Sequence, residues 1–250
     1  RKLTMSFLDR FNLGHGYRKY FSIHAANTEA LRDEVFGIRH EVYCKDLGFE
    51  ALRPDGRERD EYDEHSVHCL LRSRNDPQPP VGCARLVLTH PDDRNQPLPF
   101  ERTCATSLDR SIIDPACLPR ERIAEVSRLA VRSTYRRRKT DSDSRLIHEE
   151  DFGTGDQPRF PYIPIALYLG AVALAERNGI DTLFVLTEPR LATHFARLGV
   201  EIRQIGSPVE HRGTRIPSVM DVGSIISDMR MLLKPIWRAV REDIERSNGG

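Results

Sequence analysis

Three features that assign a chain to a special class are missing from this sequence. The five cysteines form no C-x-x-C pair and are odd in number, so they suggest neither a disulfide framework nor a zinc site. No stretch approaches the roughly 18 to 20 apolar residues of a membrane span, and residues 1–6 show no apolar signal region. The net charge of +1 argues against extensive nucleic-acid binding. The sequence therefore predicts a cytoplasmic protein with reduced, mostly buried thiols.

The composition is that of a globular protein with its own core. Hydrophobic residues make up 39% of the 250 residues and charged residues 30%. One domain is the default expectation at this length. We expect an N-terminal extension over 1–27, the main domain over 28–222 with a polar loop or lid at 140–162, and a C-terminal amphipathic helix over 223–250.

Hydrophobic periodicity predicts alternating helices and strands. The expected helices are 28–44 behind the capping residue Thr28, 163–178, a short one from Pro189 to Gly199, and about 224–245 with a kink at Pro235. The expected strands are 67–72 and 81–89, which form a hairpin, then 123–131, 182–187, 200–205 and 218–222. This order predicts an α/β (α+β) fold, in which a mixed sheet is flanked by helices and segment 123–187 forms a right-handed parallel crossover.

A short acidic run precedes the predicted hairpin. Residues 59–64 contain four carboxylates and one arginine, and such a run alone is usually a solvated turn. Charged residues elsewhere could pair with it, and buried charges need partners. They are Arg39 on the edge of the first helix, Arg85 on a strand face, and Glu125 with Arg128 in strand 123–131. A three-residue separation sends Glu125 and Arg128 to opposite faces, so they either have different roles or flank a β-bulge.

Four ordered motifs resemble those of acyl-homoserine lactone autoinducer synthases. They are Phe36-Gly37-Ile38-Arg39-His40-Glu41-Val42-Tyr43, Asp60-Glu61-Tyr62-Asp63, Cys83-Ala84-Arg85-Leu86 and Glu125-Val126-Ser127-Arg128-Leu129. A closer resemblance, to the exosortase (PEP-CTERM) system-associated acyltransferases, relatives of the N-acyl amino acid synthases, rests on Val42–Lys45, Asp60–His65, Ala124–Val131 and Arg136–Arg138. The resemblance covers roughly residues 30–222. It implies a GNAT-like fold with a mostly antiparallel central sheet and a splayed parallel strand pair, an acyl carrier protein as donor, and an amine as acceptor.

The resemblance also implies a site. Its charged set is Arg39, Asp60, Asp63, Arg85, Glu125 and Arg128, with Tyr43 at an aromatic position of the pocket. Autoinducer synthases tend to carry a Trp shortly after that aromatic residue, near their adenosylmethionine-derived substrate. Residues 44–52 contain Phe49 and no Trp, which favours another amine.

Acyl transfer to an amine needs a base, because only the neutral amine attacks. We expect Glu125 to take the proton, with Asp60 or Asp63 as the second choice. Arg39, Arg85 or Arg128 would hold a carboxylate of the acceptor and keep the acids ionised. Strand residues Ser127, Leu129, Ala130 and Val131 are expected to bind substrate, with backbone N–H groups near 129–131 stabilising the developing oxyanion.

The expected donor follows from residues 132–140. A CoA-dependent GNAT enzyme carries a glycine-rich pyrophosphate loop there, and this segment has no glycine. Acyl-phosphopantetheine of acyl carrier protein is therefore the expected donor, acyl-CoA the less favoured one, and no bound cofactor is expected. The basic run Arg136, Arg137, Arg138 and Lys139 would dock the acidic carrier, unless it is only a solvated face. The nine histidines show no ligand spacing, so no metal is expected.

The sequence leaves four functions open. The first is transfer of a long-chain acyl group from acyl carrier protein to an amino acid or similar small amine. The second is acyl-homoserine lactone synthesis from S-adenosylmethionine, and the third is CoA-dependent acetyl transfer. The fourth is a non-catalytic module that binds an acyl chain or a partner.

Overall fold

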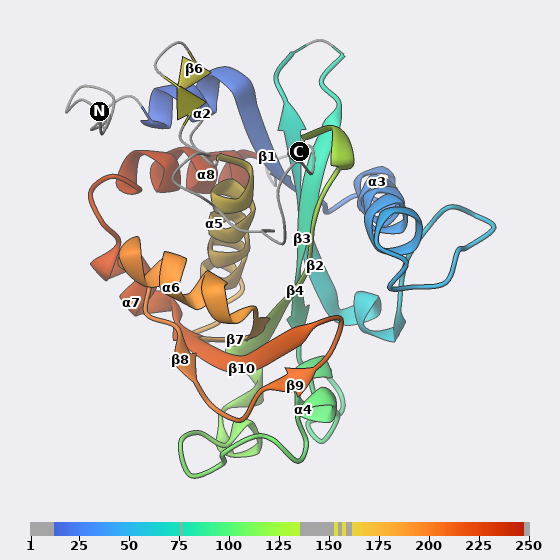
Figure 1. Ribbon diagram of the computed structural model, residues 1–250, viewed down its shortest axis with the longest axis vertical. Coiled ribbons are helices and arrows are strands. Elements are labelled where there is room, and N and C mark those ends of the chain that lie inside the picture. Colours follow the sequence, from blue (N-terminus) through green and yellow to red (C-terminus); the bar gives the residue numbers. More distant parts are fainter. Residues whose placement is uncertain (1–12, 76, 136–152, 155–156, 159–161, 248–250) are drawn as a thin grey trace.

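A single mixed sheet organises the protein (Figure 1). The computed structural model describes residues 13–75, 77–135, 153–154, 157–158 and 162–247. The strand order is β1-β2-β3-β4-β7-β10-β8, with β9 paired to β10, and each pair is antiparallel except β4 with β7. The strands are β1 Phe21–Ala25, β2 Ser66–Ser73, β3 Pro80–Leu88, β4 Ile123–Val131, β7 Thr182–Thr187, β8 Arg203–Gln204, β9 Val209–Glu210 and β10 Thr214–Asp221, beside a small ribbon of β5 Gly153–Thr154 and β6 Gln157–Pro158. This arrangement confirms the predicted fold class.

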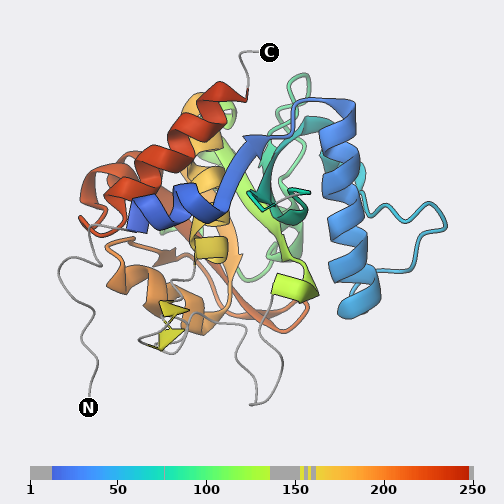
Figure 2. The same ribbon diagram turned by 90° about the horizontal axis from the view of Figure 1, so that it is seen from above.

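Helices cover both faces of the sheet (Figures 1 and 2). One face carries α2 Leu13–Tyr20, α5 Tyr162–Arg177, α6 Pro189–Arg197, α7 Val222–Asp228 and α8 Lys234–Arg246. The other carries α3 Glu29–Arg39, its π-helical continuation η1 His40–Asp46, η2 Glu61–His65 and α4 Pro99–Thr103. Single turns η3 Pro115–Cys117, η4 Arg120–Arg122 and η5 Ser133–Tyr135 lie before and after β4.

The alternation of side chains along β3 divides the core. Ala84 and Leu86 pack into the large cluster around α5, whereas Cys83 and Val87 join two smaller clusters on the α3 side. Arg85 lies between Cys83 and Val87 on that second side. A charged residue thus occupies the boundary between two apolar clusters, and this boundary becomes the candidate site.

Residues 13–25 were expected to belong to an N-terminal extension, but they form α2 and β1. Strand β1 pairs with β2 over its whole length. Asp243 of α8 accepts hydrogen bonds from the Tyr17 hydroxyl (3.0 Å) and the Ile23 amide (3.3 Å). The folded domain therefore begins before the predicted residue 28.

Two predictions near the C-terminus are wrong. The segment expected to be one helix kinked at Pro235 is two helices, since α7 ends at Asp228 and α8 starts at Lys234. Pro235 lies in the first turn of α8, where its missing N–H removes no helical hydrogen bond. The expected strand 200–205 is reduced to Arg203–Gln204.

The described residues contain no helix with the length and apolarity that a bilayer crossing requires. Most of the predicted loop or lid at 140–162 lies outside the described residues.

Candidate active site

Arg39, the last residue of α3, is completely buried between two acids. Its Nε donates to Glu58 at 2.5 Å, and its two terminal nitrogens donate to both oxygens of Asp63 at 2.6 and 3.0 Å. Such a planar, bidentate pair fixes both partners in orientation. Arg39 therefore ties the end of α3 to the segment that precedes β2.

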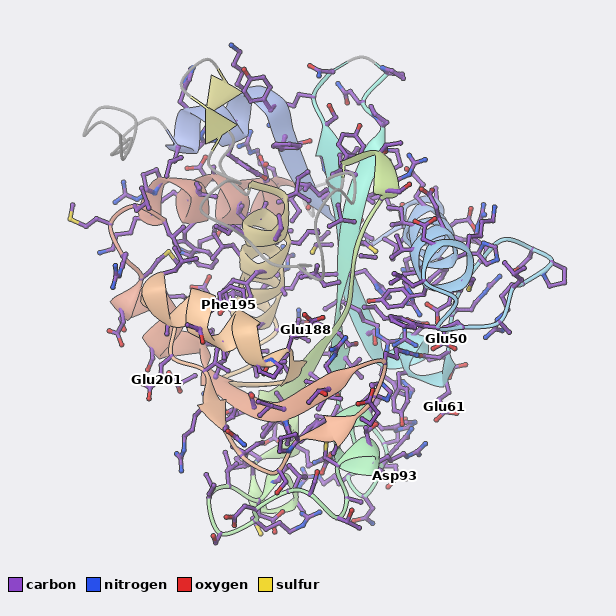
Figure 3. The ribbon with its side chains drawn as sticks, viewed as in Figure 1. Glu50, Glu61, Asp93, Glu188, Phe195 and Glu201 are labelled. Carbon is purple, nitrogen blue, oxygen red and sulfur yellow. The ribbon has the colours of Figure 1, made fainter. Side chains whose placement is uncertain are left out.

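The acidic run is not a solvated loop; it forms the short helix η2, which hydrogen bonds of its own side chains hold in place. Asp60 caps η2 by accepting from the Tyr62 amide at 3.0 Å, and Asp63 accepts from the Asp60 amide at 2.7 Å. Asp60 and Asp63 both accept hydrogen bonds from Arg85 of β3, whereas Glu61 is exposed on the α3 side of the sheet (Figure 3). The capping box therefore selects which acids enter the site.

Arg85 meets the acids that its buried strand position requires. It is 1% exposed, and its Nη1 donates to Asp60 at 2.6 Å and to Asp63 at 3.0 Å. Its Nε donates to the Ser127 hydroxyl at 3.0 Å on the neighbouring strand. The predicted pairing of Arg85 with the acidic run is present, and the structure adds its contact with β4.

A β-bulge in β4 delivers Arg128 to the same place. Between the pairs Cys83↔Ala130 and Arg85↔Ser127, β3 advances two residues and β4 three, and Arg128 has a φ of 51°. Its guanidinium reaches Glu58 at 3.3 Å and Asp60 at 3.1 Å. The sequence allowed a bulge between Glu125 and Arg128, but pairing is regular from Glu125 to Ser127 and the bulge lies between Ser127 and Ala130, starting at Arg128 itself. An arginine with positive φ is uncommon, so the ion pairs stabilise an unfavourable backbone conformation.

Glu58 belongs to this network although the sequence analysis omitted it. It is 1% exposed and accepts from both Arg39 and Arg128. Burial alone would raise the pKa values of Glu58 and Asp63, but the ion pairs with Arg39 hold both pKa values below their usual range. Glu58 could have been predicted from its two-residue spacing from Asp60, because alternate residues of an extended segment point to the same side.

His68 lies behind the ion pairs. Its side chain is buried, its ring meets Phe36 edge-on, and its Nε2 is 3.6 Å from Asp63. Burial lowers the pKa of His68 to about 3 despite the nearby carboxylate. The imidazole is therefore neutral at physiological pH.

Glu125 is on the same sheet face but outside the ion-pair network. It is 3% exposed, and its Oε2 accepts from the Phe100 amide in α4 at 2.8 Å. It forms no ion pair with any described residue. Burial raises its pKa to about 8, against the opposing hydrogen bond from Phe100. Glu125 therefore differs from Glu58 and Asp63, whose pKa values are held low by their ion pairs.

The sheet opens beside these residues. Pairing between β4 and β7 runs from Ile123↔Thr182 only to Val126↔Val185, so the second half of β4 leaves its neighbour. The Arg132 amide donates to Val81 of β3, and alternation then turns the Val131 N–H toward the opening. Leu129 is 40% exposed there, and its carbonyl accepts from the Tyr43 hydroxyl at 3.0 Å. Ala130 is buried in the α3-side core instead.

Other predicted elements lie elsewhere. Arg136, Arg137, Arg138 and Lys139 are outside the described residues. The described part of the chain has no group of three or more His, Cys, Asp or Glu side chains arranged for a metal ion.

A surface depression of about 640 Å³ is lined by residues 107–110, 112, 204, 206 and 207, and none of the predicted site residues lines it.

Comparisons with known proteins show which families and folds the chain resembles. The acetyltransferase (GNAT) domain family matches residues 38–143. An acyl-homoserine-lactone synthase from Rhizobium radiobacter is 27% identical over 179 residues, covering 72% of this chain and 69% of the relative. Among solved structures, the CoA-dependent acyl-homoserine lactone synthase BjaI has a TM-score of 0.56 at 21% identity, covering 86% of this chain and 89% of its own. FeeM, an N-acyl amino acid synthase from uncultured soil microbes, has a TM-score of 0.54 at 16% identity, covering 85% and 96%.

The fold and the relatives define an acyltransferase with the GNAT fold. Within that class, the chain is related to the acyl-homoserine-lactone synthases, as the four motifs predicted, and it shares its fold with the N-acyl amino acid synthase FeeM.

Proposed function

We propose that the protein transfers a long-chain fatty acyl group from acyl carrier protein to the amine of an amino acid or similar small amine. The observation that carries the proposal is Glu125, a buried carboxyl group with a raised pKa on the sheet face that holds the charged network. It lies two residues from the point where β4 separates from β7.

Glu125 is the general base in this scheme. The amine nitrogen attacks the thioester carbon as Glu125 accepts a proton from nitrogen, the C–S bond breaks, and the thiolate leaves and is protonated. Backbone N–H groups of β4 around Val131 donate to the carbonyl oxygen as it becomes negative. No covalent nucleophile is needed.

The remaining charged residues have positioning roles. The pKa of Asp63 is held low and Asp60 is bound by Arg85 and Arg128, so neither competes with Glu125 as a base. Arg39 and Arg85 are buried and committed to internal carboxylates. Of the three arginines predicted to hold the acceptor, Arg128 is therefore the one that can still meet a substrate.

Acyl carrier protein is the proposed donor because the segment after β4 has no glycine for a pyrophosphate cradle. The structure describes this segment only as far as the short η5 turn, and the Arg132 side chain there donates a hydrogen bond to Glu41 at 3.0 Å. The basic run 136–139 would dock the carrier. Acyl-CoA is the second donor, since BjaI and MesI are described as CoA-dependent.

Acyl-homoserine lactone synthesis is the second candidate function, supported by the 27% identical relative. The absence of Trp in residues 44–52 favours a different acceptor. The exosortase association and a cytoplasmic location remain parts of the proposal.

The test uses purified protein with acyl carrier thioesters, or the matching acyl-CoA, and a mixture of amino acids and simple amines. Mass spectrometry should detect an N-acyl product that forms faster from the carrier thioester. Methylthioadenosine released from added S-adenosylmethionine would instead support the lactone synthase. Failure to acylate any amine from either donor would contradict the proposal.

A further inference from the structure

Two arginines from distant parts of the chain lie against the same tyrosine ring. The guanidinium carbon of Arg128 is 5.4 Å from the Tyr43 ring centroid, and that of Arg212 is 5.7 Å away. Arg212 belongs to the turn between β9 and β10, and its ion pair with Glu50 connects this turn to the segment after α3. It has a φ of 57° and is followed by Gly213 with a φ of 96°. This tight turn presents the arginine to the site.

Both arginines share one carboxylate oxygen. Oε1 of Glu50 lies 3.6 Å from Nη2 of Arg128 and forms an ion pair with Nη2 of Arg212. Glu50 itself is on the α3 side of the sheet (Figure 3), held by a hydrogen bond from its amide to the Tyr43 carbonyl at 3.1 Å. A carboxylate oxygen shared by two guanidinium groups, both of which lie over one aromatic ring, is a geometry suited to carboxylate recognition.

Arg128, Arg212 and Glu50 are more exposed to solvent than the arginines at the centre of the ion-pair network. Arg39 and Arg85 are 0% and 1% exposed, whereas the side chains of Arg128, Arg212 and Glu50 are 12%, 21% and 25% exposed. Arg128 keeps Glu58 and Asp60 as partners when Glu50 moves away. A ligand carboxylate can therefore replace Glu50 without leaving Arg128 unpaired.

We infer that Arg212 and Arg128 bind the carboxylate of the acceptor, and that Glu50 is the internal counter-ion which that carboxylate replaces. This rests on the proposed function and narrows its acceptor class to amines that carry a carboxylate, such as α-amino acids. Arg212 and Glu50, which both stand outside the four motifs, are then specificity-determining residues.

The test measures equilibrium binding of two conjugates by calorimetry, so it requires no acyl transfer. N-decanoylglycine carries the carboxylate, and N-decanoylethanolamine replaces it with a hydroxymethyl group. The wild-type protein should bind N-decanoylglycine about tenfold more tightly or better. Equal affinity for the two, or no binding of either, overturns the inference.

Variants separate recognition from a structural role. Arg212→Asn suits the positive φ and removes the cation, and it should abolish the preference for N-decanoylglycine. Glu50→Gln should strengthen N-decanoylglycine binding, because the internal competitor is weakened. If Arg212 and Glu50 only tied the turn to the domain, Glu50→Gln would weaken binding of both conjugates, and that outcome contradicts the inference.

Arg215→Gln is the matched control. Arg215 follows on the same hairpin and pairs with Glu188 at 3.3 Å, so its loss should leave the preference unchanged. Loss of preference in this variant as well would show a general charge effect and would overturn the assignment. Amine turnover is scored separately: acylation of amines without selectivity for a carboxylate refutes only the inference, whereas no acylation refutes only the proposed function.

Discussion

Glu125 combines two properties that a buried carboxyl group rarely has together. It is almost inaccessible to water, and its carboxylate accepts a hydrogen bond from the Phe100 amide rather than from a cation. Desolvation favours the neutral form of Glu125 and raises its pKa to about 8, whereas the ion pairs with Arg39 lower the pKa values of Glu58 and Asp63. Acids with opposite pKa shifts therefore lie on one sheet face.

This difference makes a stability prediction for Glu125. Its pKa is about 8 in the folded state and near 4.5 when unfolded, so between these values the unfolded chain loses the proton first. The stabilising contribution is complete below pH 4.5 and is lost as the pH rises to about 8. The melting temperature of wild type minus that of Glu125→Gln should fall between pH 5 and pH 8. A difference independent of pH would show that Glu125 is not buried in its neutral form.

The candidate site could be predicted only in part from the sequence. Arg39, Asp60, Asp63, Arg85 and Arg128 stand in local motifs, and the structure brings them together. Glu50 and Arg212 are 162 positions apart and stand in no motif, so only the folded chain reveals their contact. Whether Glu125 acts on the substrate remains a prediction.

Strand β4 shows how one irregular element organises the site. Its bulge redirects Arg128, and its departure from β7 creates the opening. The sequence predicted β4 and β7 with their observed bounds, because β7 has a continuous apolar centre and β4 begins and ends with apolar residues. It overestimated β8, because Val200 and Ile205 are buried without being paired in a strand.

Close packing of β3 against β4 predicts the effect of a methyl group at Gly82. A Cβ there would lie 2.5 Å from the Ala130 carbonyl oxygen and 3.1 Å from Leu167 Cδ1. Gly82→Ala should lower the free energy of unfolding by about 1–3 kcal/mol, as urea denaturation would measure. Gly223→Ala, whose added carbon meets only Asp221 Oδ1 at 3.4 Å, should be neutral or slightly stabilising. Equal stability of both variants would argue against tight packing beside the bulge.

The two ends of the described chain meet across one edge of the molecule. Strand β1 continues the sheet beyond β2, and α2 and β1 both contact Asp243 of α8. This connection could not be predicted from the sequence, because Phe21–Ala25 and the eight residues of α2 are too short to show a clear periodicity. Residues 13–25 are therefore expected to be required for a stable domain.

Removing the Tyr17 hydroxyl tests this connection. Tyr17→Phe leaves buried Asp243 with one donor fewer, which should cost about 1–3 kcal/mol and lower the melting temperature by several degrees. Tyr20→Phe is the control, since Tyr20 is 45% exposed and should change stability by less than about 0.5 kcal/mol. Similar melting curves for the two variants would mean that the hydrogen bond contributes little.

The most direct test of acyl transfer at this site is the rate of N-acyl product formation by Glu125→Gln compared with Glu61→Gln. Both substitutions remove one carboxylate from the α3 side, but Glu61 is exposed and Glu125 is buried. Glu125→Gln should reduce kcat by about 10²- to 10⁴-fold, while Glu61→Gln stays near the wild-type rate. If folded Glu125→Gln protein made N-acyl product at the wild-type rate, the site would not perform the chemistry described.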